Sequence, residues 1–278
     1  MCIRDSYREI TRFVKRQSAK AAAQGDDPRA RAVGFLMSLY QRRLASSTYA
    51  MRHSLENRAR RLEEGLKKAQ ELVKLAPPDL PDPEEIEEME ENERERLEEI
   101  LEAITLAGNA EQVREEIAEL RQLAEQAQAV EGTDSEAKLA KLKDLLHREG
   151  FFPACAATPG GAAGRDHPAK RLLVFTEFKD TLDYLVGKLK GWGFRVGCIH
   201  GRMKSGSRDE PGTRLYSEQQ FRDGAIQVLV ATEAAGEGIN LQCCNILFNY
   251  DIPWNPNRLE QRMGRIHRYG QRKDCLIF

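Results

Sequence analysis

The chain has 278 residues, of which 41% are hydrophobic and 31% are charged, and its formal net charge is −1. This length allows one large domain or two smaller ones with a buried core. No apolar run approaches the roughly 20 residues that cross a bilayer, and the first residues lack the apolar core of a signal peptide, so we expect a cytoplasmic protein with no membrane partner.

The charge is distributed over three unlike regions. Residues 1–75 hold 17 Lys and Arg against 8 Asp and Glu, residues 76–136 hold 4 against 21, and residues 137–278 hold 22 against 15, which gives +9, −17 and +7. The chain is therefore basic at both ends and acidic in the middle, where charge of this sign repels nucleic acid.

Apolar residues recur at threes and fours from about residue 7 to residue 147, which predicts a helical half. The prolines of LAPPDLPDP at 75–83 interrupt it, because proline removes a helix donor. The glutamate-rich run at 84–104 is followed by a second helix with an apolar stripe, and the two predict a solvated helical hairpin or short coiled coil. The stripe consists of Val113, Ile117, Leu120 and Ala124.

After Lys170, short apolar runs alternate with helical stretches. Strands are predicted at 171–176, 194–199, 226–232, 245–250 and 275–278, and helices at 179–190, 213–223 and 256–268. This alternation predicts an α/β fold in which helices cover both faces of a parallel sheet. The domains expected are a helical region at 1–75, an acidic helical insertion at 76–150, a flexible linker at 151–168 and an α/β lobe at 169–278.

Ligands of such sheets gather at the carboxyl ends of the strands, and two loops there have unusual residues. Gly236 and Gly238 bracket Glu237 and can expose amide donors to an anion, although a plain tight turn explains them equally well. In the last loop, Asn255 is a predicted cap and Pro256 the first residue of a helix.

Along that helix, Gln261, Arg265 and Arg268 follow at spacings of four and three. On a continuous helix these three side chains share one face, with both guanidinium groups pointing the same way. Most arginine-bearing helices present only a solvated charged face. Two arginines opposite a second glycine loop favour a phosphate site instead.

Three stretches occur in an order that resembles a known family. The segments beginning LLVFTEF (172–203), GAIQVLVAT (224–242) and DIPWNPN (251–271) are similar to the fourth, fifth and sixth conserved motifs of the second lobe of superfamily 2 helicases. WNP before the arginines and HRYGQ after them resemble the Snf-type duplex-DNA translocases, and especially their RapA-like bacterial branch. Residues 39–64 resemble the helical bridge that follows the first lobe in that branch.

This resemblance implies a RecA-like, three-layer α/β/α lobe that acts on ATP. It implies that Arg265 and Arg268 are fingers on the γ-phosphate and that Gln261 helps to arrange the nucleotide. Further nucleotide-site positions implied by the resemblance are Gly236, Glu237, Gly238 and Asn240. Asn240 stands where many relatives have a ribose-contacting aspartate, so this sequence departs from the family there.

The resemblance also implies contacts to a nucleic-acid backbone at the strand ends. The matching positions are Thr176, His200, Gly201 and Thr232. Hydroxyls and exposed amides can position a phosphate without reading base sequence. The two threonines are equally compatible with strand-end caps, and His200 with a residue that satisfies the sheet edge. Trp254 is expected to pack under the arginine helix.

A phosphate cradle is missing from the sequence. It contains no GxxxxGK[ST] motif and no strand ending in DExx. The six cysteines form no CxxC pair and no Cys/His set at zinc spacing, which predicts reduced thiols and no metal site in this chain. We therefore expect the Mg²⁺ ligands to come from a first helicase lobe that is absent here, so that the chain is an inactive internal piece of a longer enzyme, truncated at its end.

Three functions from different classes fit these observations. The first is an ATP-driven translocase on duplex DNA, with RNA not excluded, that displaces RNA polymerase or another DNA-bound protein. The second is a helicase that separates DNA or RNA strands. The third makes the acidic helices a partner-binding arm on a lobe without catalysis of its own.

Overall fold

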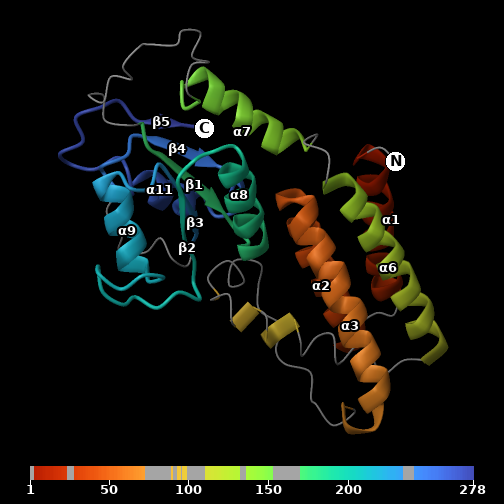
Figure 1. The fold of residues 1–278 in the computed structure, drawn as a ribbon. Coiled ribbons are helices and arrows are strands. Elements are labelled where there is room, and N and C mark those ends of the chain that lie inside the picture. Colours follow the sequence, from red (N-terminus) through yellow and green to blue (C-terminus); the bar gives the residue numbers. More distant parts are fainter. Residues whose placement is uncertain are drawn as a thin grey trace. The chain divides into compact units, whose positions relative to one another are not determined.

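The computed structural model describes most of the chain as two compact units that divide between Glu136 and Ala137 (Figure 1). The described residues are 3–23, 28–72, 89, 93, 94, 96–98, 110–131, 136–152, 170–233 and 241–278. None of the helices within these ranges combines the length and apolar character that crossing a membrane requires.

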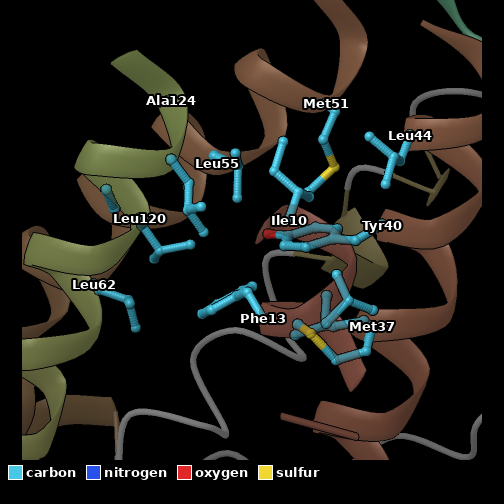
Figure 2. Close-up of a cluster of buried hydrophobic side chains, with 14 of the residues drawn as sticks. Ile10, Phe13, Met37, Tyr40, Leu44, Met51, Leu55, Leu62, Leu120 and Ala124 are labelled. Carbon is cyan, nitrogen blue, oxygen red and sulfur yellow. The ribbon is translucent and has the colours of Figure 1, made fainter. Parts of the chain in front are cut away.

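The first unit is helical. Its long helices are α1 (Ile3–Ala23), α2 (Pro28–Ser46), α3 (Thr48–Leu72) and α6 (Ala110–Glu131). The predicted apolar stripe of α6 is confirmed, because Val113, Ile117, Leu120 and Ala124 are all buried. They join a core in which α6 packs against α3 and α1. Figure 2 shows that this core takes Ile10 and Phe13 from α1.

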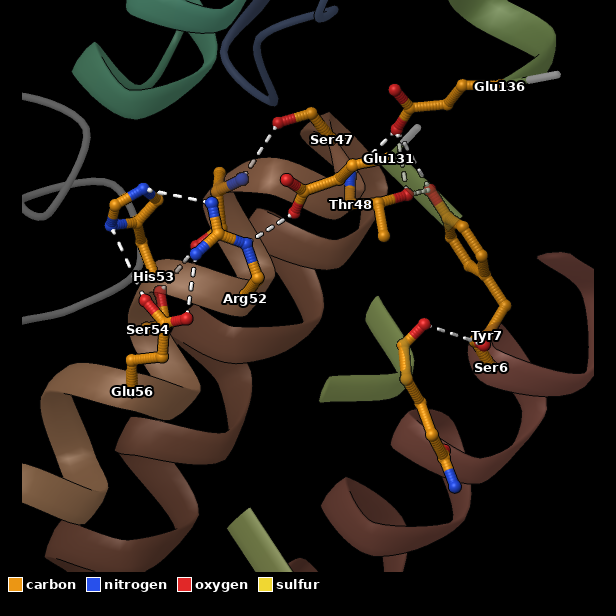
Figure 3. Close-up of polar contacts among 12 residues, drawn as sticks. Ser6, Tyr7, Ser47, Thr48, Arg52, His53, Ser54, Glu56, Glu131 and Glu136 are labelled. Atoms are coloured by element: carbon orange, nitrogen blue, oxygen red, sulfur yellow. Dashed lines mark hydrogen bonds and ion pairs between the residues drawn. The ribbon is translucent and has the colours of Figure 1, made fainter. Parts of the chain in front are cut away.

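Polar contacts fix the start of α3, as Figure 3 shows. Ser47 separates α3 from α2 and caps it, since its Oγ accepts a hydrogen bond from the amide of Ala50 at 3.1 Å. The buried carboxylate of Glu136 accepts from the amide and the hydroxyl of Thr48 at 2.7 and 3.0 Å. Arg52, one turn later, donates to Glu131 at 2.8 Å. The first acidic helix expected at 84–104 lies largely outside the described residues.

The second unit is a five-stranded parallel sheet with helices, as predicted. The strands are β1 (Leu172–Thr176), β2 (Val196–Ile199), β3 (Val228–Thr232), β4 (Ile246–Asn249) and β5 (Leu276–Ile277), in the order β2-β3-β1-β4-β5. Every residue of β1 and β3 is buried, which explains their continuous apolar runs. Thr176 pairs with Thr232 in register, so two strands end side by side.

The helices of this unit are α7 (Ala137–Arg148), α8 (Lys179–Gly191), α9 (Arg214–Asp223) and α11 (Pro256–Met263). Residues 137–148, which the expected domain boundaries place in the acidic helical insertion at 76–150, belong to the sheet unit as α7. The predicted start of α11 is confirmed, because Asn255 caps it through the amide of Asn257 and Pro256 is its first residue.

The predicted end of α11 at residue 268 is wrong, because the helix ends at Met263. The amides of Arg265 and Ile266 bond to carbonyls three residues back, and the carbonyl of Arg265 accepts from the amide of Leu241 at 3.1 Å instead of extending the helix. Arg265 and Arg268 therefore lie in a turn and do not share a helical face with Gln261.

Candidate nucleotide and nucleic-acid site at the sheet edge

Asp251, the second residue after β4, gathers polar groups at the carboxyl edge of the sheet. The residue is 8% exposed. One carboxylate oxygen accepts the hydroxyl of Thr176 at 2.6 Å and the amide of Glu177 at 3.1 Å, and the other accepts Lys138 Nζ of α7 at 2.8 Å. The hydroxyl of Thr176 is thus fully buried and engaged with Asp251 in this structure.

Thr232, at the end of the neighbouring strand, also has a buried hydroxyl, but its hydrogen bonding differs from that of Thr176. The residue is 4% exposed, and its Oγ1 has no hydrogen-bond partner among the described residues. A buried polar atom without a partner costs about 1–3 kcal/mol, so such an atom is expected where something else completes the site. A group that approaches this strand end can take the Thr232 hydroxyl as a donor.

His200 follows β2 at the same edge of the sheet and is half-buried. Burial lowers the pKa of His200 below its usual value, and the cations Lys179 and Arg214 lower it further. Its Nδ1 is buried and has no partner in the part of the chain that the structure describes. The lowered pKa favours the neutral imidazole near neutral pH, in which one ring nitrogen can donate a hydrogen bond to a phosphate.

The side chain of Arg214, the first residue of α9, holds the loop after His200. The guanidinium of Arg214 donates to the carbonyl of Gly201 at 2.6 Å and to that of Met203 at 2.9 Å. The N-cap of α9 adds to this, because Thr213 donates to the carbonyl of Ser207 at 2.9 Å. The carbonyls of Gly201 and Met203 are thereby tied to the first residue of α9.

Arg262 is a buried arginine of the site whose role the sequence did not indicate. It lies on α11 and is 2% exposed. Its guanidinium donates to Asn249 Oδ1 at 3.2 Å and to the carbonyl of Asp251 at 2.6 Å. It also bonds both carboxylate oxygens of Glu233 and lies over the ring of Phe175. A charge buried to this degree requires such partners, which come from the ends of three strands.

The two predicted finger arginines lie in residues 264–271, which we call the arginine turn. Arg268 is exposed and donates from Nε to the carbonyl of Gly264, four residues back, at 2.7 Å, whereas Arg265 is half-buried. Gln261 is exposed on the preceding helix. Gly270, at φ +99°, adopts the left-handed conformation that lets the turn close.

The arginine turn is fastened to the segment that precedes β4. Gln271 donates from Nε2 to the carbonyls of Gln242 and Cys244, both at 3.1 Å. Gln242 in return donates to the carbonyl of Tyr269 at 2.8 Å. Both ends of the turn are therefore tied to one neighbouring segment, because the carbonyl of Arg265 is also bonded to the amide of Leu241.

Two further expectations have different outcomes. Trp254 was expected to pack under the arginine helix, and this is wrong because the side chain is 79% exposed. Pro253, its neighbour, is buried. The predicted nucleotide positions Gly236, Glu237, Gly238 and Asn240 lie outside the described residues.

Comparison with known proteins finds similarity in the second unit. Residues 137–270 match the family described as helicase conserved C-terminal domain. The chain is 49% identical over 108 residues to the uncharacterized ATP-dependent helicase YqhH of Bacillus subtilis, which is 39% of this chain and 18% of that protein. It is 31% identical over 132 residues to the ATP-dependent RNA helicase dbp8 of Aspergillus fumigatus, 48% of this chain and 23% of that protein.

Two solved structures are also similar. The C-terminal part of the Fun30 ATPase domain shares 21% identity over 61% of this chain and 53% of that chain, with a TM-score of 0.41. The E. coli DEAD-box protein SrmB, bound to regulator of ribonuclease activity A, shares 27% identity over 50% of this chain and 68% of that chain, with a TM-score of 0.37. The chain thus spans less than a quarter of the two curated relatives named above.

Proposed function

We propose that this chain, whose residues 137–270 match the family described as helicase conserved C-terminal domain, provides one wall of the ATP site of a nucleic-acid translocase. In this proposal Arg265 and Arg268 act on the γ-phosphate. The observation that carries it is the arginine turn, in which two cations stand beyond the end of α11 on a backbone tied to the segment before β4. A rigid backbone keeps a guanidinium ready for charge that develops during phosphoryl transfer.

The other wall of the site comes from residues outside this chain. The sequence has no GxxxxGK[ST] motif to cradle phosphates. We place the phosphate cradle and the Mg²⁺ ligands on a first lobe of the intact protein, which would close onto the arginine turn. Residues 261 and 236–240 would lie beside the nucleotide, as the resemblance implies.

Nucleic acid would contact the carboxyl edge of the sheet. The hydroxyl of Thr232, which has no partner among the described residues, and the amide of Gly201, whose carbonyl Arg214 holds, would supply donors that recognise a phosphate without reading a base. Neutral His200 can add a hydrogen bond. The hydroxyl of Thr176 is held by Asp251, so Thr176 would donate to a phosphate only when that hydrogen bond opens. Contacts of this kind suit movement along a duplex, and we retain DNA as the first substrate to test.

The test is ATP hydrolysis by the intact protein with and without duplex DNA. An arginine finger contributes about 10³ to 10⁵ in rate, so Arg268→Ala should reduce DNA-stimulated turnover by about that factor. Arg272→Ala is the matched control, because Arg272 is also exposed and lies outside the arginine turn. Turnover of Arg268→Ala within a few-fold of the control would rule out the proposed role.

A further inference from the structure

Helix α1 of the first unit has a row of like charges that its own fold does not explain. Arg8, Arg12, Arg16 and Lys20 follow one another at intervals of four residues, and all four are exposed. Residues four apart are neighbours on a helix, and a like-charged pair at this spacing destabilises it by about 0.2–0.5 kcal/mol. Folding alone would favour an alternation of signs.

Pairs of opposite sign occur at this spacing in three other helices of this chain. Arg60 pairs with Glu64, Lys179 with Asp183 and Arg222 with Glu218, each at a spacing of four. In the row of α1, Arg16 pairs with Glu119 of α6. Within the described residues, no hydrogen bond or ion pair engages Arg8, Arg12 or Lys20.

The opposite face of α1 is already used. Ile10, Phe13 and Val14 are buried in the core of the helical unit, as Figure 2 shows for the first two. A basic amphipathic helix that binds a membrane must insert its apolar face between lipids. Because that face of α1 is packed inside the protein, the row cannot act as a membrane-inserting helix.

We propose that three members of this row, Arg8, Arg12 and Lys20, form a second nucleic-acid contact, which binds the phosphodiester backbone of a duplex outside residues 137–270. The choice of nucleic acid as the polyanion rests on the proposed function of the second unit. From Arg8 to Lys20 the helix rises about 18 Å, at 1.5 Å per residue. A duplex has one charge per roughly 1.7 Å of axis, so phosphates are dense enough to meet every member of the row. The side chains contact backbone only, so no base preference follows.

The experiment measures binding of this 278-residue chain to short duplex DNA, and to duplex RNA of the same sequence, as a function of salt. The test variant is Arg8→Gln/Arg12→Gln/Lys20→Gln. Each phosphate contact contributes about 0.9 to the slope of log Kobs against log salt, so loss of three should reduce the slope by about 2.7. A smaller slope with DNA alone would mean that the row binds the DNA backbone only. A smaller slope with both duplexes would mean that it binds either backbone.

The control triple is Arg148→Gln/Lys190→Gln/Arg195→Gln. It removes the same charge from exposed residues that lie before β1 and β2, away from the carboxyl ends of the strands. It should keep the slope. The variant Arg8→Lys/Arg12→Lys/Lys20→Arg should keep it too, because a phosphate contact needs only the charge. The Gln triple should have an unchanged or higher Tm, since like-charge pairs are lost.

Equal slopes for the Gln triple and the control triple would overturn the proposal while leaving the ATP-site proposal intact. Absence of any duplex binding by the unmodified chain would sink this proposal and the nucleic-acid part of the proposed function together. Stronger competition by polyglutamate than by duplex, lost in the Gln triple, would show that the row binds an acidic protein and would also overturn it.

Discussion

The guanidinium of Arg262 on α11 donates to both carboxylate oxygens of Glu233, the first residue after β3, at 2.9 and 3.3 Å. The same guanidinium bonds Asn249 at the end of β4. One buried side chain therefore fixes α11 to two strand ends. The arginine turn begins directly after α11. By fixing α11, Arg262 therefore also fixes the first residue of the turn that contains Arg265 and Arg268.

We predict that Arg262→Ala lowers the free energy of unfolding by about 3–5 kcal/mol, because it leaves the carboxylate of Glu233 without its main partner. Arg262→Lys should lose less, since it keeps the charge but cannot bond several acceptors at once. Urea unfolding of this chain measures both. The exposed control Arg272→Ala should stay within about 0.5 kcal/mol of the parent, and an equally small effect of Arg262→Ala would contradict the anchoring role.

Asp251→Asn should lower the free energy of unfolding by about 1–3 kcal/mol, because bonds from Thr176 and Glu177 to a charged oxygen are replaced by weaker ones. Lys138 contributes less, since its side chain is 41% exposed and such pairs are worth about 0–1 kcal/mol. The control Asp183→Asn breaks an exposed pair with Lys179 and should cost only a few tenths of a kcal/mol. An equal loss of unfolding free energy in Asp251→Asn and Asp183→Asn would contradict this role of Asp251.

Gln271→Ala should loosen the arginine turn without unfolding the unit. It removes the bonds to the carbonyls of Gln242 and Cys244. The amide of Leu241, which donates to Arg265, should then exchange its hydrogen faster. Hydrogen exchange measures this, with Gln219→Ala as a control that breaks only a bond to Asp223 on the surface of α9. Unchanged protection of Leu241 would mean that Gln271 does not hold the turn.

His200 should make the second unit less stable in mild acid. Its folded pKa lies below the unfolded value of about 6.5 because burial disfavours the charged ring. The unfolded chain therefore binds the proton first, so the contribution is full above about pH 6.5 and is lost as pH falls from there through the folded pKa. Between about pH 7.5 and about pH 5.5, the parent should lose more free energy of unfolding than His200→Gln. An equal loss of unfolding free energy in the parent and in His200→Gln would contradict a lowered pKa of His200.

Much of the α/β architecture was accessible from local patterns. Five apolar runs predicted the five strands, and β1 and β3 differ from the predicted ranges by one or two residues at their first ends. The burial of the α6 stripe follows in the same way from its spacing of three and four. Patterns of this kind reflect which face of an element is buried, and that is a property of neighbouring residues in the sequence.

What the sequence did not indicate depends on contacts between distant segments. The end of α11 follows from the bond between Leu241 and Arg265, which lie 24 positions apart. The sequence does not distinguish Arg262 from the nearby Arg265 and Arg268. Only the structure shows that Glu233 lies within hydrogen-bonding distance of Arg262. Arg258 lies four residues before Arg262 and also approaches Glu233, at 3.8 Å. This spacing is the sequence feature from which a shared acidic partner could have been predicted. The exposure of Trp254 beside the buried Pro253 was likewise not indicated by the sequence.

The most direct test of the central claim separates ATP binding from the chemical step in the intact protein. Single-turnover hydrolysis and nucleotide affinity should be measured for Arg265→Ala and Arg268→Ala, with Arg272→Ala as the control. A finger acts on the transition state, so the account predicts that the hydrolysis rate falls by about 10³ or more while ATP affinity changes only a few-fold. Hydrolysis at the parent rate, or a loss confined to ATP affinity, would contradict it.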